Sequence, residues 1–210
     1  MIPAYFMGLK VDKFRRNLLY FFNSKQNSIL TESIVKLAHI YNSKKIKSII
    51  FLNYAPQLNE FLYWCQQLMA ESLGKNGKGI LPVVSPAPRD HHSMMQLYLD
   101  GPKDKLFYIF SLNLDVKIKK NFFEKSFKYA ENKELSKVIL SQKKALIKVL
   151  QKKKIPFREF KINKINEEIL GELFSYFMVE TALVGKLIGI NPFDQPAVEE
   201  VKILTKQYLS

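Results

Sequence analysis

Residues 67–101 hold the side chains of this chain that are best suited to proton transfer. Glu71 ends an amphipathic run directly before the sequence GKNGKG, and His91 and His92 follow a proline-rich loop. A carboxylate and an imidazole held where loops meet helices or strands are the groups that general acid–base catalysis uses. Spacing alone favours a simpler interpretation of Glu71, a solvated glutamate at a helix end, so both interpretations stay open.

The two histidines follow Asp90 at the expected start of a helix. The positive end of a helix dipole lowers the pKa of an imidazole, and the first backbone amides can bind an anion. The alternative is a capping aspartate followed by two surface histidines. Lys202 follows Glu199 at i,i+3 spacing on the last expected helix, which predicts an ordinary surface ion pair. His39 has no such neighbours and is expected to be structural or exposed.

Metal and nucleotide chemistry find little support in the sequence. Asp90, His91 and His92 are too close together to share one helix face, and no further cluster of ligand residues accompanies them. The GKNGKG run lacks the pattern of a nucleotide P-loop, and no Gly-x-Ser-x-Gly elbow occurs. The sequence alone therefore supports neither a metal site nor a nucleotide-binding P-loop.

Composition predicts a globular chain. Of the 210 residues, 47% are hydrophobic and one is a cysteine, and there is no apolar run long enough for a membrane span. These features predict a cytoplasmic protein without a membrane partner. The net charge of +14 includes lysine-rich segments at 117–128 and 143–154. Because the lysines are spread out and interleaved with glutamate, we expect solvated helix faces and not a nucleic-acid partner, although a positive field also suits an anionic substrate.

Alternating strand and helix patterns predict the fold class. We expect an α/β protein, a three-layer α/β/α sandwich with a mostly parallel sheet and no internal repeat. Apolar, β-branched or alternating runs predict strands at 46–52, 80–85, 105–112 and 156–162, the last at an edge of the sheet. Periodic apolar spacing predicts helices at 11–23, 31–41, 56–72, 90–100, 134–153, 167–188 and 196–208, with a loop at 24–28 and a charged connection at 121–132.

Three stretches carry a resemblance to a known family. QLMAESLGKNGKGILPV, DHHSMMQLYLDGPKDK and ETALVGKLIGINPFDQPAVEEVK resemble the glucose-6-phosphate isomerase family, in the family's order and over most of the chain from Tyr54 onward. The resemblance is to the C-terminal portion of the family. It implies a sugar-isomerase (SIS) domain at 46–210, with C-terminal helices, and a helical segment at 1–45 that continues a missing N-terminal part.

The resemblance also implies roles for individual residues. Glu71 matches the base that shuttles a proton between C1 and C2 of the sugar, and His92 matches the acid/base that opens the ring. Lys202 matches a lysine that assists ring opening, and Gln195 matches a substrate-contacting residue. His91 stands where the family's motif has glutamine. The implied partners are glucose 6-phosphate, fructose 6-phosphate and a second copy of the chain, which lends its histidine to its neighbour, and no cofactor is implied.

Two expected parts of the family's site have no counterpart in the sequence. A Gly-Gly-Arg segment would precede Met1, and a phosphate-binding loop belongs to the other domain. We therefore expect a truncated or split isomerase that is weakly active or inactive alone and that an N-terminal partner polypeptide restores. The alternative from a different class is a non-catalytic SIS module that binds a phosphosugar or a protein.

Overall fold

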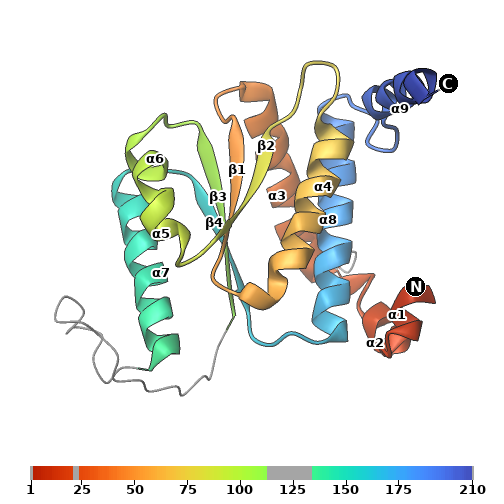
Figure 1. Cartoon of the computed structure of the whole chain (residues 1–210). Helices are drawn as coiled ribbons and strands as arrows, with labels where there is room; N and C mark the ends of the chain where they lie inside the picture. Colours follow the sequence, from red (N-terminus) through yellow and green to blue (C-terminus); the bar gives the residue numbers. More distant parts are fainter. Residues whose placement is uncertain (1, 21–23, 113–133, 210) are drawn as a thin grey trace. The chain divides into compact units, whose positions relative to one another are not determined.

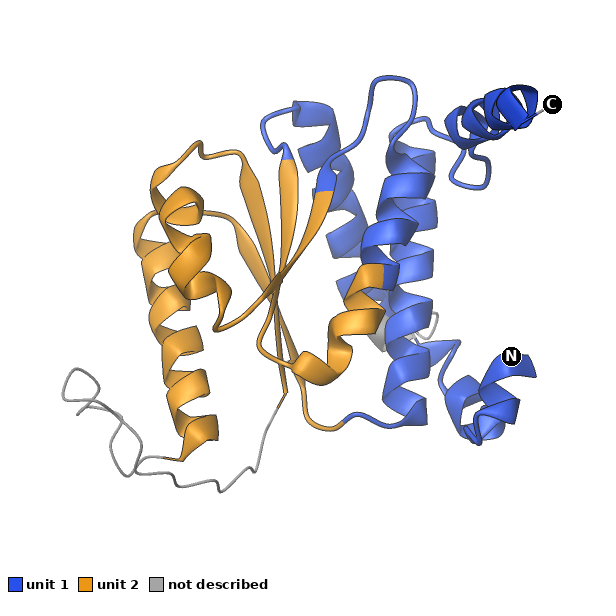
Figure 2. Cartoon of the chain, in the orientation of Figure 1, with its two compact units in different colours: residues 1–47, 64–81, 165–210 blue, residues 48–63, 82–164 orange. Residues whose placement is uncertain are grey.

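The protein is described by a computed structural model, which covers residues 2–20, 24–112 and 134–209. The lysine-rich segment 117–128 and the connection predicted at 121–132 lie outside these residues. The described chain divides into two compact units (Figure 2). One comprises residues 1–47, 64–81 and 165–210, and the other comprises residues 48–63 and 82–164. We call them the first and the second unit. The predicted boundary between residues 45 and 46 stays a prediction.

A four-stranded sheet is the centre of the second unit (Figure 1). Its strands run in the order β2-β1-β3-β4, and β1 and β4 each pair with β3 in parallel. Ile50 of β1 lies opposite Phe107, which in turn lies opposite Phe157 of β4. The strands are β1 (Ser48–Asn53), β2 (Leu81–Pro86), β3 (Lys105–Leu112) and β4 (Phe157–Ile162). All four predicted strands are confirmed within two residues.

Burial follows the position of each strand in the sheet. The central strands β1 and β3 are almost fully buried, as continuous apolar runs in parallel sheets are. Strand β4 is only half-buried and lies at one edge, as its alternating sequence predicts. The predicted fold class, an α/β sandwich built on a mostly parallel sheet, is confirmed.

One face of the sheet carries the apolar core of the second unit. Helices α6 (Met95–Asp100) and α7 (Leu135–Lys152) contribute to this core, and the short helix α5 (Asp90–Ser93) precedes α6 in the chain. Its buried members come from strands, loops and helices alike: Ile50, Leu52, Tyr54, Ala87, Tyr98, Phe107, Ile109, Leu146, Leu150 and Ile155. The predicted helix at 90–100 is interrupted at Met94, so it forms two short helices and not one.

Two helix predictions near the N-terminus are wrong. Helix α3 begins at Ser24, although its polar first residues predicted a loop at 24–28. Its buried side chains, Leu30, Ile34 and Leu37, have helical spacing, and this apolar stripe fixes the helix. The predicted helix at 11–23 is too long, because α2 (Val11–Arg16) ends at Arg16; residues 21–23 of the prediction lie outside the described residues.

The first unit consists of helices. They are α1 (Ile2–Phe6), α2, α3 (Ser24–Ser43), the later part of α4 (Asn59–Leu73), α8 (Glu167–Leu187) and α9 (Pro196–Leu209). Trp64 of α4 packs edge-on against Phe174 of α8, with ring centroids 4.4 Å apart. Helix α2 approaches α8 so closely that a Cβ on Gly171 would lie 2.0 Å from the carbonyl oxygen of Phe14. The absence of a side chain at Gly171 therefore permits the close approach of α2 to α8.

Helix α8 has a side-chain cap at its start. Asn166 accepts a hydrogen bond from the backbone N–H of Ile169, at 3.0 Å, and two glutamates follow in the first turn. An asparagine cap and early acidic residues both stabilise a helix N-terminus. The predicted start at Glu167 is confirmed, and the position of Gln195 depends on how this helix ends.

Candidate functional site

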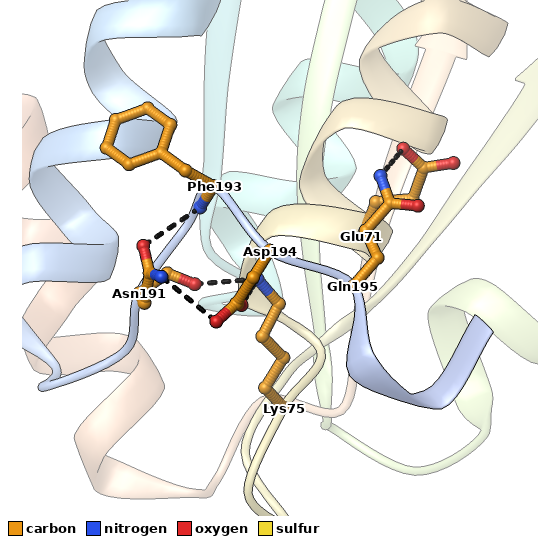
Figure 3. A network of polar contacts seen from close by, with 6 residues as sticks. All are labelled: Glu71, Lys75, Asn191, Phe193, Asp194 and Gln195. Atoms are coloured by element: carbon orange, nitrogen blue, oxygen red, sulfur yellow. Dashed lines mark hydrogen bonds and ion pairs between the residues drawn. The ribbon is translucent and has the colours of Figure 1, made fainter. Parts of the chain in front are cut away.

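Glu71 and Gln195 are joined in the first unit (Figure 3). Gln195 donates a hydrogen bond from Nε2 to Oε2 of Glu71, at 2.8 Å. Gln67, one turn earlier on α4, donates from its Nε2 to the other oxygen, Oε1, at 2.9 Å. Glu71 is half-buried near the end of α4, so the predicted helix-end position is confirmed. Two amides thus fix the orientation of a single carboxylate.

The glycines that follow Glu71 build a tight turn. A Cβ on Gly79 would lie 3.0 Å from the Cα of Gly74, so the two ends of the turn touch backbone to backbone. Between them Gly77 adopts φ +67°, a left-handed conformation that favours glycine. The turn places Lys75 and Lys78 directly after the helix. The segment is therefore a tight connection that positions these two lysines.

Gln195 is positioned by the way α8 ends. The N–H of Ile190 donates to the carbonyl of Gly185 at 2.8 Å, and the N–H of Gly189 donates to that of Lys186 at 3.2 Å. With φ +70° at Gly189, this is a Schellman motif, which reverses the chain sharply. A Cβ on Gly185 would lie 3.2 Å from the Cβ of Pro192, so the chain after the motif packs closely on the helix.

A second set of polar contacts lies beside the Glu71–Gln195 pair (Figure 3). Lys75 donates from Nζ to the carbonyl oxygen of Asn191, at 2.6 Å, and to Oδ1 of Asp194, at 2.8 Å. The other oxygen of Asp194 accepts from Nδ2 of Asn191 at 2.9 Å. The hydrogen bond from Lys75 holds the pKa of the Asp194 carboxyl below its ordinary value. The segment before Gln195 is thereby held to the turn after α4.

His91 belongs to the second unit, where its ring meets Tyr54. Its Nε2 and the phenol oxygen of Tyr54 share a hydrogen bond, and the two rings pack edge-on at 5.6 Å. Burial, with a smaller contribution from His92, lowers the pKa of His91, and burial raises the pKa of Tyr54. The pair is therefore a neutral phenol beside a neutral imidazole at physiological pH.

Asp90 is buried and accepts three hydrogen bonds. Ser85 donates to Oδ2 at 2.8 Å, and Arg89 and Ser93 donate to Oδ1 at 3.1 and 3.2 Å. Burial raises the pKa of the Asp90 carboxyl, but these hydrogen bonds outweigh it and hold the pKa below its ordinary value. Asp90 thus stays ionised and links β2 to α5.

Of the two interpretations left open for this helix start, the contacts favour surface histidines over an anion site. The backbone N–H groups of His91 and His92 already donate to the carbonyls of Pro88 and Arg89, at 3.0 and 3.1 Å. Helix α5 has only four residues, which is too short to provide a substantial dipole. The His92 side chain is exposed and has no hydrogen-bond partner among the described residues.

The remaining predicted site residues have ordinary surroundings. Lys202 donates from Nζ to Oε1 of Glu199 at 2.6 Å, and both side chains are well exposed. The i,i+3 ion pair that the spacing predicted is thus confirmed. His39 is exposed on α3. The structure therefore brings Glu71 and Gln195 together, pairs Lys202 with Glu199, and places both His91 and His92 in the second unit.

Sequence reasoning assigned no role to Lys75, Asn191 and Asp194. All three lie inside the stretches that resemble the isomerases, so the signal was present. The contact between Lys75 and Asp194 could not be predicted from the sequence, because the two residues are 119 positions apart in the chain. Across residues 2–20, 24–112 and 134–209, no three histidine, cysteine or acidic side chains are grouped so that they could hold a metal ion. Within the same ranges, no helix is both long and apolar enough to cross a membrane.

Two curated relatives match nearly the whole chain. A probable glucose-6-phosphate isomerase of Methanococcus maripaludis is 36% identical over 189 residues, which is 89% of this chain and 42% of the relative. A glucose-6-phosphate isomerase of Methanocaldococcus jannaschii is 32% identical over 209 residues, which is 96% of this chain and 51% of the relative. No family model matches the chain. The chain spans about half the length of these relatives.

Solved structures share the fold. A hypothetical protein of Thermus thermophilus has 25% identity and a TM-score of 0.85, over 99% of this chain and 52% of that chain. A glucose-6-phosphate isomerase of Chlamydia trachomatis has 17% identity and a TM-score of 0.65, over 84% and 38%, which supports the fold alone. The chain is thus an α/β protein whose fold is shared with these two solved structures. Its predicted resemblance to the C-terminal portion of glucose-6-phosphate isomerase is confirmed.

Proposed function

We propose that the chain supplies part of the active site of an aldose–ketose isomerase that interconverts glucose 6-phosphate and fructose 6-phosphate. The observation that carries the proposal is the hydrogen bond between Gln195 and Glu71. These residues come from two of the three stretches that resemble the isomerases, and the fold brings them together. The names of the relatives support the same reaction.

Glu71 acts as the base in this proposal. The proton on C2 of the open-chain aldose is weakly acidic because it is α to a carbonyl, and a positioned carboxylate can remove it. A cis-enediol exposes C1 and C2 on one face, so the same carboxylate returns the proton to C1. The amides of Gln67 and Gln195 each occupy one lone pair of a Glu71 oxygen and leave another for the proton.

Ring opening needs a second proton transfer, from the anomeric hydroxyl to the ring oxygen. We assign it to His92 with the assistance of Lys202. The exposed imidazole of His92 is able to engage a substrate, and the exposed ion pair of Lys202 is weak and easily exchanged. As the resemblance implies, the histidine acts in the site of a second copy of the chain. The reaction needs no cofactor, and a cytoplasmic setting stays a prediction.

Complementation tests the proposal. The chain is mixed with an N-terminal fragment of a curated relative that ends where the match to this chain begins. Conversion of fructose 6-phosphate is then coupled to a glucose-6-phosphate dehydrogenase. We expect activity from the mixture and little from either part. Glu71→Gln should reduce it by about 10²–10⁴-fold, the usual contribution of a general base. Glu60→Gln, on the exposed start of the same helix, is the matched control.

Two results oppose the proposal. Activity that persists in the Glu71→Gln mixture would exclude Glu71 as the base. Phosphosugar binding without any turnover in the complemented wild type would instead favour the non-catalytic SIS module.

A further inference from the structure

Lys75 is held far more firmly than a surface lysine. Its side chain is only 9% exposed, whereas that of Lys202 in its surface pair is 59% exposed. An exposed ion pair contributes little, because solvent screens it and two long side chains must be ordered. Lys75 in addition donates to a backbone carbonyl, that of Asn191, so its position is fixed by two acceptors on one segment.

The segment from Asn191 to Gln195 is braced on both sides. One carboxylate oxygen of Asp194 accepts a hydrogen bond from Nζ of Lys75, and the other accepts one from Nδ2 of Asn191. Asn191 also accepts from the N–H of Phe193, at 3.1 Å, through its own side chain. Both contacts of the Asp194 carboxylate therefore restrain the residue that directly precedes Gln195.

Apolar packing does little to hold the end of this segment. Phe193 is 82% exposed, and both Asp194 and Gln195 are exposed as well. Pro192 is the member of the segment that packs closely, against the helix at Gly185. Beyond Pro192, the polar contacts are what determine where Gln195 lies.

We propose that Lys75 is a positioning residue, whose ammonium fixes residues 191–195 so that Gln195 stays hydrogen-bonded to Glu71. The effect of Lys75 on catalysis rests on the proposed function, because Lys75 acts only through Gln195 and Glu71. Its effect on the position of Gln195 is independent of the proposed function. The ammonium supplies two directed hydrogen bonds, and a side chain that fills the same space without a charge supplies neither.

The geometry is tested in the isolated chain by the side-chain amide signals of Gln195 in ¹H–¹⁵N spectra. In the wild type, Glu71→Gln should shift these signals, since their acceptor changes. In Lys75→Met, which keeps the length of the side chain, they should move to the positions of solvent-exposed glutamine and no longer respond to Glu71→Gln. Lys75→Arg should restore part of the response.

Lys78→Met is the matched control. Lys78 lies in the same turn and also donates to a carbonyl after α8, that of Ile188 at 2.5 Å, but it does not contact residues 191–195. Its loss should leave the Gln195 signals as in the wild type. Asp194→Asn is the second variant, in case Lys75→Met fails to fold. It removes the ion pair with almost no change in shape and should shift the Gln195 signals in the same direction.

Activity gives a separate readout. In the complemented enzyme, Lys75→Met should lower kcat by about 10- to 100-fold, the cost of a misplaced site residue, while Lys78→Met should not. Unchanged Gln195 signals in both Lys75→Met and Asp194→Asn would overturn the inference. If the signals move but no variant or wild type shows isomerase activity, the proposed function fails and the positioning role of Lys75 stands.

Discussion

Gln195 and Glu71 share a hydrogen bond of 2.8 Å although 124 residues separate them in the chain. The contact depends on two helix ends in the same unit. The glycine turn after α4 lets Lys75 reach the segment 191–195, and the Schellman motif after α8 directs that segment towards α4. A half-buried carboxylate held by two neutral amides is suited to accept and return a proton.

The two amides on Glu71 are not equivalent, and their removal should show it. Gln195→Ala should lower kcat of the complemented enzyme by about 10-fold or more, because a hydrogen bond to a charged group contributes roughly 1.5–3 kcal/mol. Gln67→Ala removes the bond to the other oxygen but not the residue that the resemblance identifies with substrate contact. A larger effect on KM for Gln195→Ala than for Gln67→Ala is therefore expected, and equal effects would contradict the assignment of Gln195.

The pair of His91 and Tyr54 should make stability depend on pH. Because the pKa of His91 is lowered by burial, the unfolded chain binds more protons than the folded chain just below pH 6.5. The contribution of His91 to the free energy of unfolding should thus be fully present above pH 6.5 and be lost progressively as the pH falls below 6.5. Urea unfolding at pH 8 and pH 5.5 measures the change.

His91→Gln, which places the residue of the family's motif at this position, provides the control. It should lose the part of the pH dependence that belongs to His91. Asp90 does not interfere, since its pKa is held low and its contribution is lost only at more acidic pH. An unaltered dependence in His91→Gln would show that other groups cause it.

Gly171→Ala should destabilise the chain even though alanine favours helices. Alanine in place of glycine inside a helix normally stabilises it by about 0.5–1 kcal/mol. Here the new Cβ would lie 2.0 Å from the backbone oxygen of Phe14, so α2 must move, at a cost of about 3 kcal/mol. Gly185→Ala, in the same helix, meets side-chain atoms at 3.2 Å or more and should cost less. Thermal unfolding distinguishes the two.

Lys143 should matter for stability, in contrast to its neighbour in the same basic run. Its ammonium is buried between Oε1 of Glu159, at 2.6 Å, and the hydroxyl of Ser111, at 2.9 Å. Removing one member of a buried ion pair leaves the other uncompensated, so Lys143→Ala should cost about 3 kcal/mol. Lys144→Ala, on the exposed side of α7, should change the free energy of unfolding by less than about 0.5 kcal/mol. Similar values for both would refute a structural role.

The sheet could be predicted from the sequence because its signals are local. Runs such as Ile49–Leu52 and Leu106–Phe110 are apolar and end at clear loop residues. The start of α3 could not be predicted in this way. Its first residues are polar and typical of loops, and the buried apolar stripe of the helix begins only at Leu30. The interruption at Met94 likewise leaves no mark in the apolar spacing.

The candidate site was predicted only in part, for a related reason. Spacing alone favoured a solvated helix end for Glu71, and only the resemblance linked it to Gln195. The ion pair of Lys75 and Asp194 joins residues that are distant in the chain, and nothing in the sequence around either residue specifies its partner. His91 was noted as a departure from the family's motif, yet its contact with Tyr54 became visible only in the folded chain.

The packing of Trp64 on Phe174 gives the molecule a built-in optical reporter. Trp64 is the only tryptophan in the sequence, and both rings belong to the first unit. Intrinsic tryptophan fluorescence therefore follows the packing of α4 on α8 in that unit, while far-ultraviolet circular dichroism follows helices in both units. If the two signals change at the same urea concentration, the two units unfold as one cooperative body. Separate midpoints would reveal two independently folding parts without any added label.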